Sequence, residues 1–150
     1  MGSAKENANR SRARSRLVQA LYQYAVAGQT AQEIERQFIA EGLGEIDVAY
    51  FRDLIYAIIE RAEEIDRLLE LLLDRPLVQL DPVERSILRL GAYELMERYE
   101  IPRSVIIDEA VELARRFGAE QSHRYVNGVL DKFAGQIELR ASERAMRGRS

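Results

Sequence analysis

Apolar residues recur every three or four positions along almost the whole chain, which is the pattern of amphipathic helices. No segment shows the strict alternation of a half-buried strand. In the first helical segment, residues 9–27, the apolar seam consists of Leu17, Val18, Leu21, Tyr24 and Ala25. The sequence therefore predicts an all-α fold of about seven helices, arranged as two small bundles that share one core.

Local start and stop signals divide this pattern into separate helices. Gly28 ends the first segment, and Thr30 with Glu33 has the spacing of a capping box. Asp81 followed by Pro82 supplies an N-cap and a proline in the first turn, which predicts another helix start. The helices are thus predicted to be joined by short turns.

The apolar pattern between residues 51 and 72 is too long for a typical globular helix, so we expect a bend near residues 61–64. The last helix is expected to run from about Gln121 to Ile137. These boundaries predict a flexible basic leader at residues 1–9, a helical domain at 10–137 and a disordered basic tail at 138–150.

Composition narrows the class of protein. The 150 residues include no cysteine, which excludes disulfides, thiolate zinc sites and cysteine nucleophiles and is typical of a reducing cytoplasm. The apolar runs are too short to span a membrane, and the start of the chain lacks the apolar stretch of a signal peptide. We therefore expect a cytoplasmic protein without a membrane segment.

Charge is distributed unevenly. The chain as a whole carries −3, but residues 1–16 carry +4 and residues 138–150 carry +2, which leaves −9 on the body. Basic arms of this kind bind phosphate backbones. The alternative is that they only keep the protein soluble.

Catalytic side chains are scarce. His123 is the only histidine and has no nucleophile and carboxylate at a recognisable spacing. No glycine-rich loop follows a strand, and the carboxylate runs are typical of solvated helix faces. The sequence therefore predicts neither an enzyme nor a cofactor or metal site.

The arginines of the first helix lie on two faces. At 100° per residue, Arg10 and Arg14 fall on the face of the apolar seam, whereas Arg12 and Arg16 fall nearly opposite. An unpaired arginine is costly to bury. We therefore expect the first turns to overhang the core or to stay unfolded until an anionic partner binds.

The last helix carries a second basic group. Arg124, Tyr125, Gly128 and Lys132 lie together outside the apolar stripe of this helix. An aromatic ring between two cations suits single-stranded nucleic acid, because bases stack and phosphates pair with charge. The alternative is that Tyr125 packs on a neighbouring helix and Gly128 serves a helix–helix contact.

Several blocks of sequence together resemble one family. They are Arg14, 18–22 (VQALY), 48–54 (VAYFRDL), 88–95 (LRLGAYEL), 107–114 (IDEAVELA), 117–120 (FGAE) and 123–132 (HRYVNGVLDK). In this order they resemble the NusB family of bacterial transcription antitermination factors. The resemblance implies an all-α fold of two helical subdomains that binds boxA RNA of ribosomal RNA operons together with NusE. It also implies that NusA, NusG and RNA polymerase join the complex.

The resemblance also assigns residues to these partners. RNA contacts in the family come from the N-terminal arginines and the start of the last helix; carried over, with Lys132 from the pattern above, they are Arg10, Arg12, Arg14, Arg16, Tyr22, Gln121, Arg124, Tyr125 and Lys132. The family usually has phenylalanine at the position of Tyr125 and often aspartate at that of Gln121, which puts a role for the Gln121 side chain in doubt. Glu84 matches a glutamate at the NusE interface.

Two other functions compete with this one. A NusB-like domain also precedes the catalytic domain of some RNA methyltransferases, but the chain has no cofactor-binding strand–loop–helix and no cysteine nucleophile. A helical protein-interaction module would need no RNA specificity at all. Some family members self-associate, so the resemblance also allows a homodimer.

Overall fold

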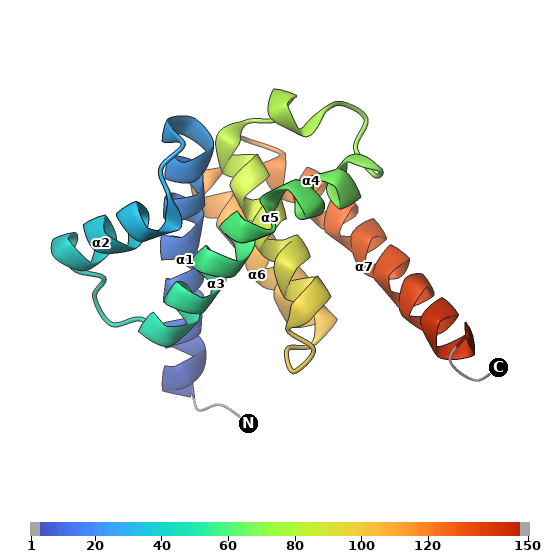
Figure 1. Cartoon of the computed structure of the whole chain (residues 1–150), viewed down its shortest axis with the longest axis horizontal. Coiled ribbons are helices and arrows are strands. Elements are labelled where there is room, and N and C mark those ends of the chain that lie inside the picture. Colours follow the sequence, from blue (N-terminus) through green and yellow to red (C-terminus); the bar gives the residue numbers. More distant parts are fainter. Residues whose placement is uncertain (1–3, 148–150) are drawn as a thin grey trace.

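The computed structural model describes the backbone of residues 4–147 and the side chains of residues 4–138 and 141. Within them the chain forms seven α-helices and one short 3-10 turn, with no strand, which confirms the predicted fold class (Figure 1). The elements are α1 (Ala4–Ala27), α2 (Ala31–Glu41), α3 (Val48–Glu60), α4 (Ala62–Glu70), η1 (Leu77–Gln79), α5 (Pro82–Glu97), α6 (Arg103–Phe117) and α7 (Ser122–Arg147).

Helix α5 lies at the centre of the molecule. It packs against α1 and α3 from the first part of the chain and against α4, α6 and α7 from the rest. The largest side chains between these helices are fully buried, among them Leu17, Leu21, Phe51, Leu88 and Leu130. They belong to one continuous apolar cluster, so the helices before and after the bend share one core.

The predicted helix boundaries at three sites are confirmed. Thr30 accepts from the backbone N–H of Glu33 while the Glu33 carboxylate accepts from that of Thr30, which completes the capping box. The Asp81 carboxylate accepts from the N–H of Val83 at the start of α5. The expected bend falls at Arg61, where φ is −103° and ψ is 16° between α3 and α4.

The chain termini differ from the prediction. Residues 4–9 were expected to form a flexible leader, but α1 already begins at Ala4. Helix α7 continues to Arg147, through most of the segment expected to be a disordered tail, and its second half projects from the body (Figure 1). Residues 1–3 and 148–150 of these predicted segments lie outside the described residues.

No helix among residues 4–147 is long and apolar enough to cross a membrane.

Candidate nucleic-acid interface

Arg14 points into the protein interior, where its side chain is 3% exposed. Its Nε donates to both carboxylate oxygens of Glu94 on α5, at 3.1 and 2.9 Å, and its Nη1 lies 3.5 Å from a carboxylate oxygen of Glu109 on α6. The expectation that the first turns overhang the core because Arg14 could not be buried is therefore wrong. The cost of burial is offset by a buried carboxylate partner.

Tyr50 on α3 completes this buried cluster by donating its hydroxyl proton to Glu94. Burial, followed by the charge of Glu94, raises the pKa of Tyr50 well above its usual value. Burial also raises the pKa of Glu94, although the charge of Arg14 and the Tyr50 hydrogen bond act in the opposite direction. Burial lowers the pKa of Arg14, but the charge of Glu94, together with that of Glu109, more than offsets this effect and raises the pKa above its usual value.

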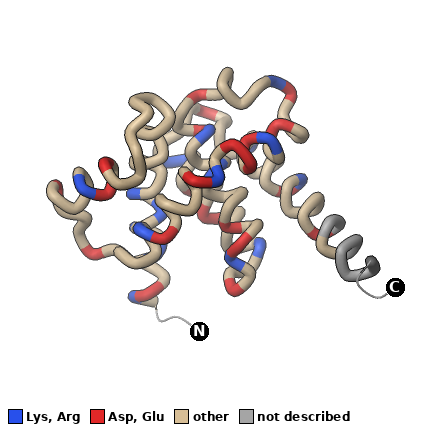
Figure 2. Tube along the Cα trace, in the orientation of Figure 1, with Lys and Arg blue, Asp and Glu red and all other residues tan. Residues whose placement is uncertain are grey.

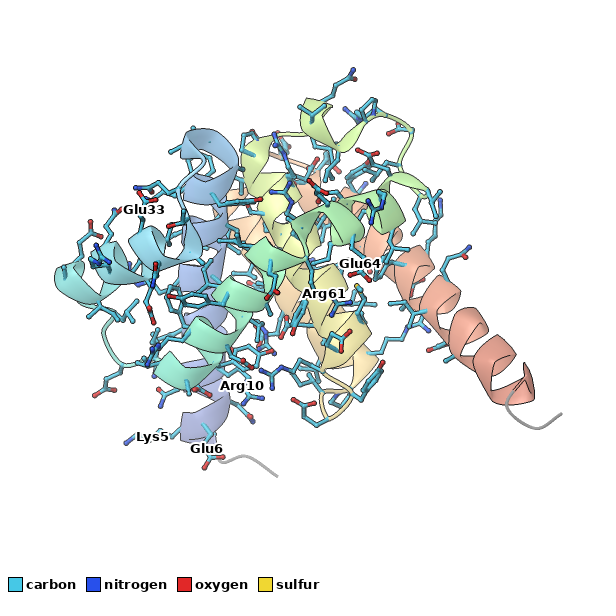
Figure 3. All side chains as sticks on the ribbon, in the orientation of Figure 1. Lys5, Glu6, Arg10, Glu33, Arg61 and Glu64 are labelled. Carbon is cyan, nitrogen blue, oxygen red and sulfur yellow. The ribbon has the colours of Figure 1, made fainter. Side chains whose placement is uncertain are left out.

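Arg10 lies one turn before Arg14 and contacts the same tyrosine from the outside. Its guanidinium carbon is 4.3 Å from the centre of the Tyr50 ring, a cation–π distance, and its Nη2 is 3.5 Å from Asp47. Figure 3 labels Arg10 beside the first turn of α3. About a third of its side chain remains exposed, so Arg10 is partly available to a ligand.

Arg12 and Arg16 lie on the outer face of α1. The Nε of Arg12 donates to the backbone carbonyl of Glu45 at 2.7 Å, which orients an otherwise exposed side chain. Arg16 is half-buried and donates to Gln19, one turn further on, at 3.1 Å. Neither guanidinium has a carboxylate among the ion-pair partners of the described residues. The basic positions recur along α1 in Figure 2.

Tyr22 extends this surface toward the turn between α6 and α7. Its side chain is 40% exposed. Seven residues earlier, on nearly the same side of α1, the Ser15 hydroxyl accepts from Arg116 at 3.0 Å. Because Arg116 lies in the last turn of α6, Tyr22 lies on the side of α1 that α6 and its following turn approach.

Gln121 forms the entry to α7 through its backbone. Its φ of 73° lies in the left-handed region, which is uncommon for a residue other than glycine. Its carbonyl oxygen accepts from the N–H of Arg124 at 3.1 Å and, more distantly, from that of Tyr125. This turn directs the side chains of Arg124 and, two helical turns later, Lys132 to the exposed face of α7.

Tyr125 is half-buried and packs beside the loop that precedes η1. Its hydroxyl donates to Asp74 at 3.3 Å, and the guanidinium of Arg75 lies 5.5 Å from the ring centre. Burial, followed by the charge of Asp74, raises the pKa of Tyr125. The ring therefore lies beneath a loop cation and against the apolar core, with part of its surface exposed.

Glu84 joins the starts of α5 and α7, because its carboxylate accepts from the Ser122 hydroxyl at 2.5 Å. Among the described residues, Gly128 serves no contact between helices, because a Cβ placed there would meet no atom within 4 Å. In the described part of the chain, no group of three or more His, Asp or Glu side chains is placed to hold a metal ion.

A sequence model described as the NusB family matches residues 11–135 of this chain. The chain belongs to the NusB family. It is 69% identical to the transcription antitermination protein NusB of Halorhodospira halophila over 147 residues, which is 98% of this chain and 95% of that protein. It is 49% identical to the protein of the same name from Nitrosococcus oceani, over 93% of this chain and 95% of the relative.

The fold is shared as well. A solved structure of NusB from T. maritima superposes with a TM-score of 0.76 at 33% identity, covering 90% of this chain and 93% of that one. The chain is thus related over nearly its full length to proteins named transcription antitermination protein NusB.

In this member of the NusB family the sequence-predicted site residues fall into three groups. Arg10, Arg12, Arg16 and Tyr22 present their side chains along α1, and Arg124, Tyr125 and Lys132 present theirs along α7. Arg14 is turned inward, and Gln121 contributes a backbone turn. The helix α5 packs against both α1 and α7 and joins the two surfaces.

Three residues around the site, Arg75, Glu94 and Tyr50, were not predicted from the sequence. No sequence pattern identifies Arg75, because its position depends on the path of the loop before η1. The sequence does contain a feature that identifies Glu94, and Tyr50 is its hydrogen-bond donor. Glu94 follows Ile87 and Leu90 at helical spacing on the buried stripe of α5, where an isolated carboxylate requires a cation or a hydrogen-bond donor.

Proposed function

We propose that this protein is a transcription antitermination factor that binds boxA RNA of ribosomal RNA operons together with NusE. Bound to this RNA, the pair joins NusA, NusG and RNA polymerase in the cytoplasm and makes elongation resistant to terminators. Membership of the NusB family supports this assignment, since the relatives bear the name of transcription antitermination proteins.

The observation that carries the RNA-binding part is the partly exposed aromatic ring of Tyr125 among cations. Arg124 and Lys132 are exposed on α7, and Arg75 adds a third cation from the neighbouring loop. A base stacked on the tyrosine would have phosphate partners on either side. This arrangement suits a single strand better than a duplex, whose bases are not free to stack on protein.

The arginines of α1 extend the proposed surface. Arg12 and Arg16 form no ion pair with a carboxylate of the described residues, so phosphates would not have to displace one. Arg10 is partly exposed, and Tyr22 lies toward the α6–α7 turn, between the two basic regions. We therefore propose that one strand of RNA runs from α1 across this turn to the start of α7.

NusE is proposed to bind near Glu84. This half-buried carboxylate already holds Ser122 at the first turn of α7, immediately before Arg124 and Tyr125. A protein bound here would touch the same helix start that contacts RNA. Such continuity explains why the two partners would bind as a unit.

The test is a comparison of boxA RNA with a scrambled RNA of equal length, each titrated with the protein and NusE by fluorescence anisotropy. We expect tighter binding of boxA and a steep loss of affinity with rising salt, because several phosphates are contacted. Equal affinity for both RNAs would refute the assignment. Weak binding that does not depend on salt would instead favour a protein-interaction module.

A further inference from the structure

The first half of α1 is held to the protein almost entirely by polar contacts. Between Ala4 and Arg16 the only buried apolar side chain is that of Ala13; continuous apolar packing begins at Leu17. Short helical segments without an apolar face are marginal in water. Something other than hydrophobic burial must therefore fix the turns that carry Arg12 and Arg16.

The polar contacts of this segment converge on one place. Arg14 binds Glu94 through its Nε, and Tyr50 donates to the same carboxylate, which is 2% exposed. One turn before Arg14, the Ser11 hydroxyl donates to Glu109 and the Arg10 guanidinium lies over the Tyr50 ring. Glu94 is thus the buried acceptor around which helices α1, α3 and α5 meet.

This anchor sets the direction of the exposed arginines. Arg12 and Arg16 stand two residues before and after Arg14, so they point away from the interior when Arg14 points in. A rotation of α1 that withdrew Arg14 from Glu94 would also turn Arg12 and Arg16. The backbone bond from Asp47 N–H to Asn9 C=O, at 3.1 Å, holds the helix start in the same register.

We propose that Glu94 is a positioning residue for RNA binding: its buried pairing with Arg14 and Tyr50 fixes the first half of α1 so that Arg12 and Arg16 face the RNA in one register. The inference rests on the proposed RNA-binding function. It assigns Arg14 an internal role, in contrast to the direct RNA contact that the family resemblance implies. Phosphate binding then costs little ordering of the arm, because the helix is already in place.

The chain contains a second arginine–carboxylate pair that serves as a control, in which the carboxylate of Asp66 is 24% exposed and that of Glu94 is 2% exposed. Arg89 on α5 binds Asp66 on α4 in a two-pronged pair at 2.8 and 2.7 Å, and the Arg89 side chain is 8% exposed. Asp66→Asn neutralises a carboxylate partner of arginine just as Glu94→Gln does. It acts on the α4–α5 contact, outside the proposed RNA surface.

The experiment measures boxA affinity at several salt concentrations, with NusE present, for wild type, Glu94→Gln, Asp66→Asn and the apolar replacement Arg14→Met/Tyr50→Phe/Glu94→Leu, which leaves no buried hydroxyl without an acceptor. Hydrogen exchange of residues 6–16 is followed without RNA. We expect Glu94→Gln to bind roughly 5- to 30-fold more weakly, as when one or two residues must be ordered on binding. In Glu94→Gln the slope of log affinity against log salt should become smaller, and hydrogen exchange of residues 6–16 should become faster. Asp66→Asn should match wild type in affinity, in this slope and in hydrogen exchange.

The triple replacement separates anchoring from direct contact. If Glu94 acts by holding the helix, an apolar set of similar volume restores both protection and affinity, because buried ionic clusters can often be replaced in this way. Affinity that stays low although residues 6–16 are protected would mean that Arg14 itself contacts RNA, and would overturn the proposal.

Two further outcomes distinguish a failure of this inference from a failure of the proposed function. Unchanged exchange in Glu94→Gln refutes the positioning role whatever the RNA does, whereas a wild type that does not prefer boxA refutes the function. If Glu94→Gln does not fold, Tyr50→Phe removes only the second donor to Glu94 and keeps the ring beneath Arg10. It must then show the same changes to a smaller degree, and wild-type behaviour would overturn the proposal.

Discussion

Gly91 on α5 lies directly against Leu130 on α7. A Cβ added to Gly91 would lie 2.6 Å from one methyl carbon of Leu130 and 3.2 Å from the other. Leu130 is fully buried, so its side chain has little space into which it can move. The missing side chain of Gly91 therefore sets how closely the central helix and the last helix approach.

We expect Gly91→Ala to lower the free energy of unfolding by about 1–3 kcal/mol, the usual cost of overpacking a core. Gly128→Ala is the matched control on α7, because a Cβ there meets no atom within 4 Å. Alanine favours the helix over glycine, so this variant should gain up to about 1 kcal/mol. Urea unfolding followed by circular dichroism measures both; a Gly91→Ala protein as stable as wild type would show that Leu130 relocates freely.

The buried tyrosine predicts a dependence of stability on alkaline pH. The pKa of Tyr50 is raised in the folded protein, first by burial and then by Glu94, so the unfolded chain loses the proton more readily. Its contribution to stability is therefore complete below the unfolded pKa of about 10 and is lost as pH rises above it, by about 1.4 kcal/mol per pH unit.

Tyr50→Phe isolates this contribution, since the pKa values of Tyr93 and Tyr125 are also raised and remain so in both proteins. The variant should be less stable than wild type near neutral pH, because the hydrogen bond to Glu94 is gone. The difference should shrink between pH 10 and 11 in urea unfolding. A constant difference would mean that Tyr50 does not resist ionisation.

Features that depend on neighbouring residues were predictable from the sequence. The capping box at Thr30, the start of α5 at Asp81 and the bend at Arg61 each follow from residues within one or two turns. The buried stripe of α7, with Val126, Leu130 and others, follows from helical spacing in the same way. The order of the helices and their inner faces was thus available without a structure.

Contacts between distant residues were not predictable in the same way. The sequence placed Arg14 on the apolar face of α1 but gave no partner, and Glu94 lies 80 positions away. The premise that an unpaired arginine is costly to bury was sound, yet the conclusion that the arm overhangs was wrong because a partner exists. A search for a carboxylate on another buried stripe would have found Glu94.

The aromatic ring on α7 predicts a loss of RNA affinity on truncation. We expect Tyr125→Ala to weaken boxA binding by about 1–3 kcal/mol, the usual value of a stacked base. Tyr125→Phe keeps the stacking face and loses only the 3.3 Å hydrogen bond to Asp74, so it should bind nearly as well as wild type. Equal affinity of all three proteins in anisotropy titrations would identify Tyr125 as a packing residue.

Loss of an outward arginine of α1 should change how RNA affinity depends on salt, but not how strongly the protein prefers boxA to scrambled RNA. Contacts to phosphates do not depend on which base is present, so Arg12→Ala or Arg16→Ala should weaken binding of boxA and of scrambled RNA by the same factor. Each lost contact to a single strand should also reduce the slope of log affinity against log salt by about 0.7. Arg36→Ala is the control, because Arg36 is equally a surface arginine but lies on α2.

Two results would separate the roles of these arginines. A smaller slope with an unchanged ratio of boxA to scrambled affinity means that α1 supplies charge, while discrimination rests on α7 and NusE. A slope equal to that of wild type would mean that Arg12 stays bound to the carbonyl of Glu45, and Arg16 to Gln19, in the complex. The strand would then have to leave α1 and follow α7 alone.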